Sequence, residues 1–436
     1  MNKEIFRLAI PNMISNITVP LMGIFSTAIA GHLGDGAHTI GALAVGVSIF
    51  NFIYWNCSFV RMSTSGFTAQ AFGAGRFAET TAVLVRAVVV SLFLGVLLVS
   101  LQRPLGEFAL WVMNGDDMVA DYFYARIWAV PAGIMLFGLN GWFTGMQNAV
   151  IPMITAIVVN LFHVVFSLWF VFGEEMGIAG IAYAAVVAQW SGMAVAVVML
   201  IVKFRKMLRP VKLAEVLALA PMREFFRANA DIMIRTFCIV AVYTFFTAAS
   251  ARLGDTVLLA VNSMLMQLFT LFSYMNDGFA YAAEALTGRF IGANNRQSLR
   301  KAVRYSLVWT FAIALFCIVI YVGWWREILD LFIDDEGVQR QHFFEVAERY
   351  VGWVIAIPLL SAFSFLIDGV LVGATLTRTM RDTMVLATIA YFAVYFATRS
   401  YLGNDAIWLA FASYMVMRGV LQYLMSSHVR DFVGGR

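Results

Sequence analysis

Seven charged side chains stand inside long apolar runs of the sequence, where charge is rare. A charged side chain at the centre of a bilayer costs about 2.5–3.5 kcal/mol on insertion scales, so each one needs a structural or functional reason. Acids in such places can bind and release protons or sodium ions, and arginines can pair with acids. The seven residues are Arg61, Asp231, Arg235, Asp277, Glu284, Asp368 and Arg418.

The three aspartates are the candidates for ion coupling. Asp277 and Asp368 have no opposite charge within one turn of their own helices, which favours titrating groups over purely structural ones. Asp231 has Arg235 four residues further on, on the same helix face. An ion pair that lets this helix insert is therefore the alternative to a coupling role for Asp231.

Arg61, Arg235 and Glu284 are candidates for charges that line a cavity or form a gate. Glu284 lies near the expected end of its helix, close to Arg289. A local salt bridge between Glu284 and Arg289 at the membrane interface is the alternative, and the spacing favours it.

His163 and Ser167 are four residues apart, so they lie on one helix face in the first half of the chain. A serine beside a histidine is a weak indication of nucleophilic chemistry. Because no orienting acid stands nearby in sequence, an intramembrane enzyme is disfavoured. Both residues are instead candidates for lining a cavity.

The elements that must position these side chains are membrane-spanning helices. Of 436 residues, 61% are hydrophobic and 13% are charged, against about 25% charged in soluble domains. A bilayer core needs about 20 apolar residues per helix, and open strands cannot satisfy their backbone in lipid. We expect an all-α polytopic protein with spans at roughly 9–31, 39–62, 82–102, 120–146, 151–173, 178–202, 228–250, 257–283, 301–324, 349–375, 381–401 and 405–427.

Basic residues alternate with acidic ones along the expected loops. Lys3 and Arg7 precede the first span, and the stretch 203–227 is strongly basic, whereas Asp116 and Glu174 stand in alternate loops. Cytoplasmic loops collect Lys and Arg, so both termini are expected in the cytoplasm. The net charge of +4 is small and says nothing about nucleic acid, and we expect no nucleic-acid partner. The three scattered cysteines have neither a disulfide pattern nor the spacing of a zinc site, and we expect no metal.

The two halves of the sequence repeat each other. TAQAFGAGR at Thr68 matches LTGRFIGANNR at Leu286, and LNGWFTGMQNAVIPM at Leu139 matches IDGVLVGATLTRTM at Ile367. With six spans each, the halves have the same membrane orientation, as in transporters with parallel repeats. The repeat makes Asn140 the counterpart of Asp368, and Arg61 the approximate counterpart of Asp277. We expect a six-helix lobe at 1–202, a cytoplasmic linker at 203–227 and a second six-helix lobe at 228–436.

The sequence resembles the multidrug and toxic compound extrusion (MATE) family, specifically its DinF-like branch. The motifs that carry the resemblance extend over both halves: NITVPLMGIFSTAIAGHLG at Asn16, RMSTSGFTAQAFGAG at Arg61, DIMIR at Asp231, DGFAYAAEALTG at Asp277 and IDGVLVGATLTR at Ile367. The resemblance implies two six-helix lobes that open alternately to the two sides of the membrane. It also implies export of organic, often cationic or amphipathic, compounds in exchange for protons or sodium ions, without a cofactor.

The sequence departs from the family pattern at two acids. Family members usually carry an Asp in the first helix, where this chain has Ser26, and often an acid or Asn in the fifth, where it has Ser167. Ser26 therefore joins Asn140, His163 and Ser167 as a candidate for lining a cavity in the N-terminal lobe, and coupling is expected in the C-terminal lobe. The alternative function is a flippase for a lipid-linked precursor. We expect a monomer in a bacterial inner membrane that contacts lipid and a small organic substrate.

Overall fold

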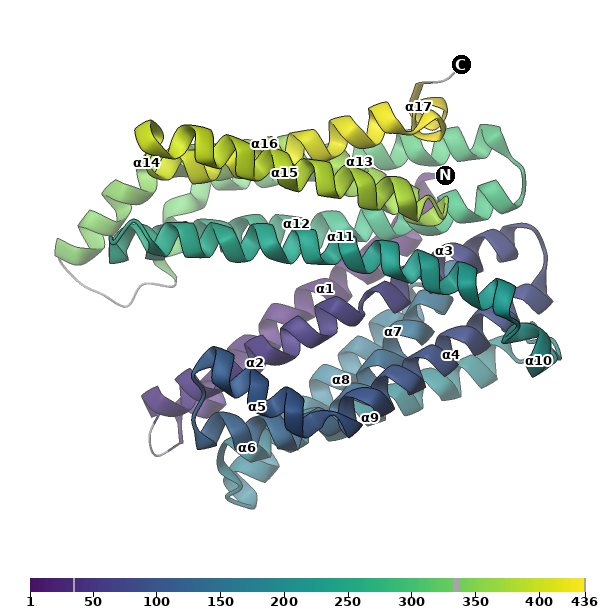
Figure 1. Cartoon of the computed structure of the whole chain (residues 1–436), viewed down its shortest axis with the longest axis horizontal. Coiled ribbons are helices and arrows are strands. Elements are labelled where there is room, and N and C mark those ends of the chain that lie inside the picture. The colour runs from purple at the N-terminus through teal and green to yellow at the C-terminus, as the bar shows by residue number, and fades with distance from the viewer. Residues whose placement is uncertain (34–35, 332–337, 435–436) are drawn as a thin grey trace. The chain divides into compact units, whose positions relative to one another are not determined.

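The computed structural model describes residues 1–33, 36–331 and 338–434, and its regular elements in those ranges are helices (Figure 1). Twelve helical segments there are long and apolar enough to cross a membrane. A helix satisfies its backbone hydrogen bonds internally, which any segment in lipid requires. The prediction of an all-helical chain with twelve spans is confirmed.

Contacts between residues divide the chain into two units. The unit that we call the N-lobe comprises Ile10–Ala230 with Gly292–Asn294. The other unit, the C-lobe, comprises Met1–Ala9, Asp231–Ile291 and Asn295–Arg436. The division of the sequence at 1–202, 203–227 and 228–436 stays a prediction.

Most of the N-lobe comes from the first half of the chain, although the first residues of α1 belong to the C-lobe. Within the N-lobe, α8 packs along α9, and α7 packs against both α3 and α4. A short amphipathic helix, α5, was not predicted. The elements are α1 (Asn2–Gly31), α2 (Gly36–Cys57), α3 (Phe59–Gly73), α4 (Phe77–Ser100), α5 (Gln102–Met113), α6 (Asp117–Arg126), the 3-10 helix η1 (Ile127–Ala129), α7 (Val130–Gly145), α8 (Val150–Leu168), the π-helix η2 (Trp169–Gly173), α9 (Gly177–Phe204) and α10 (Leu213–Val216).

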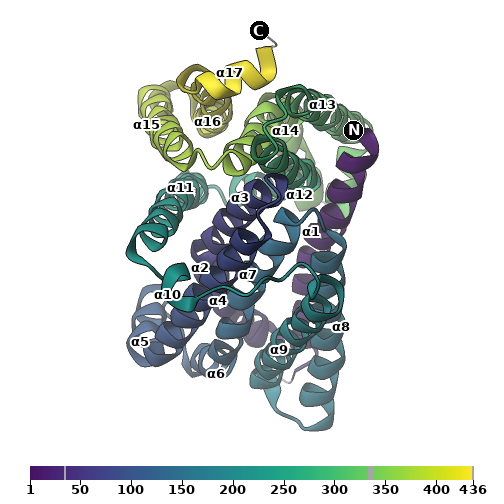
Figure 2. The same cartoon turned by 90° about the vertical axis from the view of Figure 1, so that its right-hand side faces the viewer.

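Most of the C-lobe comes from the second half of the chain, although α11 begins within the N-lobe and enters the C-lobe at Asp231. Within the C-lobe, α15 packs along α16, and α14 packs against α13 and α16 (Figure 2). The elements are α11 (Leu219–Ala251), α12 (Thr256–Gly292), α13 (Arg296–Asp330), α14 (Val338–Gly373), α15 (Thr377–Leu402), α16 (Asn404–Met425) and α17 (Ser427–Gly434).

Several helices are longer than the apolar runs that predicted them. The second span was expected to end near residue 62, but α3 continues to Gly73. Its additional turns contain Ser63, Thr64 and Ser65, which are all buried inside the N-lobe. Small polar side chains that pack against other helices do not need an apolar sequence, so hydropathy alone underestimates helix length there.

The basic stretch 203–227 lies along α4 of the N-lobe. Its short helix α10 is held where Arg86 donates a hydrogen bond to the carbonyl oxygen of Val216 at 2.9 Å. The backbone N–H of Arg209 donates to the hydroxyl oxygen of Thr81 at 3.1 Å. These contacts fasten the stretch to the lobe at two points, so it is an ordered segment and not a loose tether.

A pair of glycines brings two helices into close contact in each lobe. In the N-lobe, a Cβ atom at Gly141 of α7 would lie 2.3 Å from the backbone oxygen of Arg61 on α3. In the C-lobe, a Cβ atom at Gly369 of α14 would lie 2.2 Å from the backbone oxygen of Ala280 on α12. Gly145 and Gly373, one turn further on, repeat these contacts, so each lobe contains the small-residue seam typical of membrane helices.

The matching seams correct one register of the internal repeat. Because Arg61 and Ala280 face equivalent glycines, Arg61 occupies the place of Ala280 in its lobe. Asp277 lies three residues earlier, about one turn away. The approximate pairing of Arg61 with Asp277 was therefore wrong by one turn, because a few matched letters do not fix a helix register.

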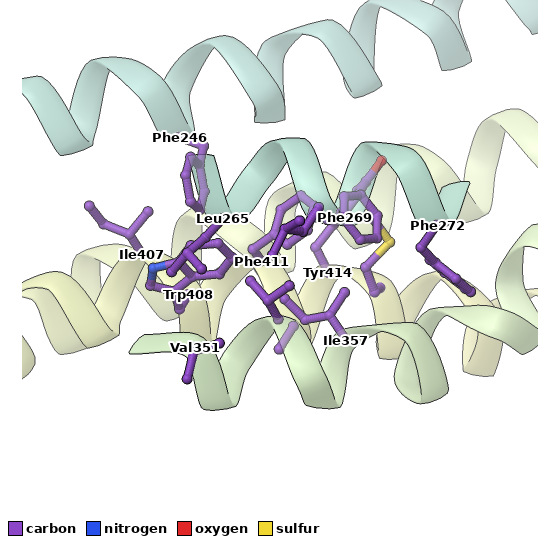
Figure 3. Packing of buried hydrophobic residues seen from close by; sticks show 14 of the residues in the cluster. Phe246, Leu265, Phe269, Phe272, Val351, Ile357, Ile407, Trp408, Phe411 and Tyr414 are labelled. Carbon is purple, nitrogen blue, oxygen red and sulfur yellow. The ribbon is translucent and has the colours of Figure 1, made fainter. Parts of the chain in front are cut away.

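An aromatic core fills the centre of the C-lobe (Figure 3). Phe269 of α12 lies edge-on to Phe411 of α16, with ring centroids 5.2 Å apart. Trp408 packs on Phe246 of α11 at 4.9 Å, and its indole N–H donates to Asn262 at 2.9 Å. Edge-to-face aromatic pairs add to the energy of area burial. This packing gives α11, α12 and α16 a rigid frame for the polar groups beside it.

Candidate functional site

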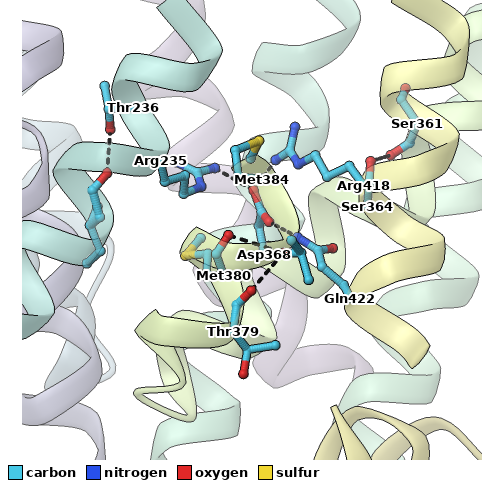
Figure 4. A network of polar contacts seen from close by, with 12 residues as sticks. Arg235, Thr236, Ser361, Ser364, Asp368, Thr379, Met380, Met384, Arg418 and Gln422 are labelled. Carbon is cyan, nitrogen blue, oxygen red and sulfur yellow. Dashed lines mark hydrogen bonds and ion pairs between the residues drawn. The ribbon is translucent and has the colours of Figure 1, made fainter. Parts of the chain in front are cut away.

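The strongest polar cluster of the C-lobe is centred on Asp368 of α14 (Figure 4). Its carboxylate accepts hydrogen bonds from Arg235 of α11 and from Arg418 and Gln422 of α16. Arg418 and Gln422 are four residues apart and so extend from the same face of α16. One carboxylate therefore ties three helices together.

The cluster is buried and carries more positive than negative charge. The side chains of Asp368, Arg418 and Arg235 are 7%, 4% and 11% exposed. The guanidinium carbon of Arg418 also lies 5.1 Å from the ring centre of Phe365. Two guanidinium groups share one carboxylate, which strongly stabilises the negative charge on Asp368. The Nε atoms of both arginines are buried, with no hydrogen-bond partner among the described residues.

The surroundings of Asp368 differ from those expected. The sequence showed no opposite charge within one turn of Asp368, and both of its arginines come from other helices. Neighbours on the same helix therefore gave no sign of a carboxylate that is doubly ion-paired. The coupling role of Asp368 stays a prediction.

Asp231 and Arg235 do not form the expected pair along α11. Asp231 pairs instead with Arg381 of α15, with a nitrogen–oxygen distance of 2.6 Å, and accepts a hydrogen bond from Thr377 at 3.0 Å. In the described part of the chain, Arg235 has its ion pair with Asp368. The i, i+4 spacing placed both residues on one face correctly, but each is satisfied by a different helix.

The acids of α12 are seven residues apart, about two turns, so they lie on one face of the helix and differ in burial. Asp277 is half-buried, within electrostatic range of Tyr243 on α11. Glu284 is 1% exposed, and its backbone oxygen lies in the glycine seam with α14. Arg289, which we expected beside Glu284, forms an ion pair with Glu4 of α1 at 3.1 Å.

The polar candidates of the N-lobe lie on three helices. Ser26 of α1 is 8% exposed, and Ser167 of α8 is fully buried. Asn140 directly precedes the glycine seam of α7, and its Oδ1 accepts a 3.5 Å hydrogen bond from Thr155. His163 is 9% exposed and lies within electrostatic range of an arginine on α6, Arg126.

Arg126 is the functional candidate that sequence reasoning missed. It lies in the predicted span 120–146, so a complete count of charges inside the spans would have found it. It was overlooked because it stands at the end of α6, only ten residues beyond the acidic residue Asp116. The structure places it, partly buried, within electrostatic range of His163.

Comparison with known proteins gives consistent matches along the chain. The family model called MatE matches residues 11–169 and 232–397. The DNA damage-inducible protein F of Escherichia coli is 33% identical over 427 residues, which cover 96% of this chain and 90% of that protein.

Solved structures share the fold at lower identity. An outward-facing multidrug resistance MATE family transporter of the MOP superfamily matches with a TM-score of 0.85 at 18% identity, covering 97% of this chain and 94% of that one. A MOP superfamily transporter from Pyrococcus furiosus, described as having a binding pocket of reverse polarity, matches with a TM-score of 0.87 at 17% identity. That match covers 99% of this chain and 96% of the other.

Proposed function

The chain belongs to the MatE family of multidrug efflux transporters, and on that premise we propose that it is a secondary active antiporter. It would export organic compounds, often cationic or amphipathic, in exchange for protons or sodium ions. As a family member it is a multi-pass membrane protein with small-molecule substrates, and transporters of this class need no cofactor.

The observation that carries the proposal is the buried carboxylate of Asp368. While it is charged, it holds Arg235 of α11 and Arg418 of α16 against α14. Protonation would remove the shared negative charge and leave two guanidinium groups that repel each other. A proton on Asp368 would therefore have different energies in conformations that keep the three helices together and in those that separate them. Such a difference is the requirement for coupling.

Of the two candidate coupling ions, the cluster favours the proton. A sodium ion would bring a further positive charge to a site that already has two, and it would compete with three hydrogen-bond donors for the carboxylate oxygens. A proton neutralises the carboxylate and needs no cage of oxygen ligands. We therefore propose proton exchange at Asp368.

The other polar candidates keep the roles proposed from the sequence. Asp231, which joins α11 to α15, and Asp277 complete the proposed set of coupling acids. Charges of the cavity or gate are Arg61, Arg235 and Glu284, and the proposed lining of the N-lobe consists of Ser26, Asn140, His163 and Ser167. We also propose a monomer in the bacterial inner membrane with both termini in the cytoplasm.

Reconstituted transport tests this proposal. Purified protein in liposomes is given a pH gradient or a sodium gradient, and uptake of a cationic, a neutral and an anionic fluorescent compound is followed. The key variant combines Asp368→Asn with Arg418→Gln, because it removes the titratable group and keeps the net charge of the cluster at +1. In the double variant only the positive charge of Arg235 remains, and in the wild type two arginines and one aspartate also sum to +1.

We expect the pH gradient to drive transport by the wild type and not by the double variant. Glu348→Gln is the matched control, because Glu348 lies in the same lobe in an exposed ion pair with Arg326. It should transport like the wild type. Wild-type transport by the double variant would show that Asp368 does not carry the ion, and transport driven by sodium alone would exclude the proton.

A further inference from the structure

The interior of the N-lobe holds a positive charge that no described acid balances. Arg126 ends α6, and its side chain is partly buried. Among the described residues, its hydrogen bond goes to the phenolic oxygen of Tyr122, and no ion pair joins it to a carboxylate. Even a partly buried charge without a counter-charge is costly, which points to a ligand of opposite sign.

Aromatic rings hold the guanidinium group of Arg126 in place. Its central carbon lies 4.9 Å from the ring centre of Phe50 and 5.4 Å from that of Tyr122. Such cation–π contacts orient an arginine and leave its charge uncompensated. The Nε atom of Arg126 is buried and has no hydrogen-bond partner in the described part of the chain, so this donor of the guanidinium group is free to bind a ligand.

Further polar groups of the N-lobe lack hydrogen-bond partners among the described residues. The hydroxyl group of Tyr54 on α2 is buried without a partner, and Tyr54 lies within electrostatic range of Arg126. His163 of α8 is also within that range. Ser167, one turn beyond His163, is fully buried, and its hydroxyl group is unpartnered. Hydroxyl groups and a guanidinium group can all donate hydrogen bonds to an anion.

Two glycines make room for the tyrosines of this site. A Cβ atom at Gly133 of α7 would lie 2.6 Å from the ring of Tyr54, and one at Gly46 of α2 would lie 2.3 Å from the ring of Tyr122. Real Cβ atoms do not approach so closely, so both rings occupy space that only glycine leaves free. The backbone around them thus fixes both rings, that of Tyr122 in contact with Arg126 and that of Tyr54 within its electrostatic range.

We propose that Arg126, Tyr54 and Ser167 form a site for the anionic group of an amphipathic organic molecule, a carboxylate or a sulfonate. The planar guanidinium fork matches two oxygens of such a group, and the hydroxyl groups supply further donors. The partly buried ring of Tyr54 offers apolar surface to the rest of the molecule. This inference rests on the proposed function as an exporter. It adds that amphipathic organic anions are among the exported substrates.

Equilibrium binding to the purified full-length protein in detergent tests the site without any gradient. The probes are dansylglycine, which carries a carboxylate, its neutral methyl ester, and dansylcadaverine, which carries an ammonium group; fluorescence anisotropy gives each Kd. The wild type should bind dansylglycine most tightly. Arg126→Gln should weaken that binding about tenfold or more and leave the ester within about twofold, because hydrogen bonds to charged groups are strong.

Two further variants separate charge from geometry. Arg126→Lys should keep the preference for the acid over the ester at reduced affinity, because an ammonium group lacks the planar fork. Tyr54→Phe should weaken dansylglycine severalfold and not the ester. The matched control is Arg399→Gln, which removes an exposed arginine of the C-lobe that stacks on Phe396 at 5.0 Å, and it should change nothing.

Equal affinity of the wild type for the acid and its ester would overturn the proposal, as would an unchanged preference in Arg126→Gln. If Arg126→Gln does not fold, Tyr54→Phe decides in the same way, and an unchanged preference overturns the site. Failure of proton-driven transport with anion-selective binding intact would contradict the antiport function alone. Transport without anion-selective binding would contradict the anion site alone.

Discussion

Charge balance around Asp368 leads to an expected order of stabilities that is independent of transport. In Asp368→Asn, Arg235 and Arg418 lose their shared counter-charge while they remain 11% and 4% exposed. In Arg418→Gln, the ion pair of Arg235 with Asp368 remains and the cluster becomes neutral. We therefore expect the loss of the single carboxylate to cost more stability than the loss of one of the two arginines.

The magnitudes follow from what each variant leaves behind. Breaking a buried ion pair by removing one partner typically costs about 3–5 kcal/mol, and Asp368→Asn does this to two arginines at once. Arg418→Gln loses a charge-assisted hydrogen bond, about 1.5–3 kcal/mol, and the contact with Phe365, about 0.5–2 kcal/mol. Neutralising the surplus positive charge offsets part of that loss. The double variant restores the net charge of +1 and should be more stable than Asp368→Asn alone.

Thermal unfolding in detergent, followed by tryptophan fluorescence at one scan rate, ranks the variants. Because such unfolding is often irreversible, the order of the midpoints is compared and not a free energy. We expect Asp368→Asn to be lowest, the double variant to be above it, and Arg418→Gln to be higher still. Glu348→Gln should unfold with the wild type. The reasoning is refuted if Asp368→Asn unfolds at or above the midpoint of Arg418→Gln.

Two further substitutions test the seam and a helix end. Gly369→Ala would place a Cβ atom 2.2 Å from the backbone oxygen of Ala280 and should lower the stability of the fold by about 1–3 kcal/mol or more. Gly352→Ala on the same helix is the control, because its Cβ atom would meet nothing within 4 Å. Equal unfolding midpoints of the two variants would contradict the close contact. Asp116 caps α6, because its carboxylate accepts a hydrogen bond from the Val119 N–H at 3.0 Å. This hydrogen bond lowers the pKa of Asp116. The stabilisation by the charged cap is therefore fully present above the usual aspartate pKa of about 3.9 and is lost as the pH falls through the lowered pKa. Asp116→Ala should therefore lower the midpoint at neutral pH and lose that difference in acid, and a constant difference would exclude the charged cap.

Periodicity and hydropathy predicted the number of spans but not the lengths of helices that pack through polar turns. In α3, Ser63, Thr64 and Ser65 are buried, but a hydropathy scale based on transfer into lipid predicts a loop there. In α12, Glu284 and Thr287 have the same effect, because they are buried against protein and do not face lipid. Hydropathy measures the preference of a side chain for lipid over water, whereas these side chains pack against neighbouring helices and contact neither.

The sequence predicted which residues form the candidate site but not how they pair with one another. Rarity of charge in apolar runs singled out Asp368, Arg235 and Arg418 without any knowledge of their contacts. Their pairing depends on how α11, α14 and α16 pack, and spacing along one helix carries no information on that. Asp231 shows the same limit, because the neighbour at i+4 was available and the structure pairs it with Arg381 on α15.

Equivalent backbone positions in the two lobes carry a neutral side chain in one lobe and a charged side chain in the other. Asn140 and Asp368 each directly precede the first glycine of their seam, but the neutral amide hydrogen-bonds Thr155 and the carboxylate holds two arginines. In the N-lobe, Arg126 on another helix has no ion pair with a carboxylate among the described residues. If a proton binds Asp368 and an anion binds Arg126, the two ligands share no residue and cannot compete directly. Their exchange must then run through conformations that each ligand stabilises differently, and linkage requires that each alters the affinity of the other by the same factor.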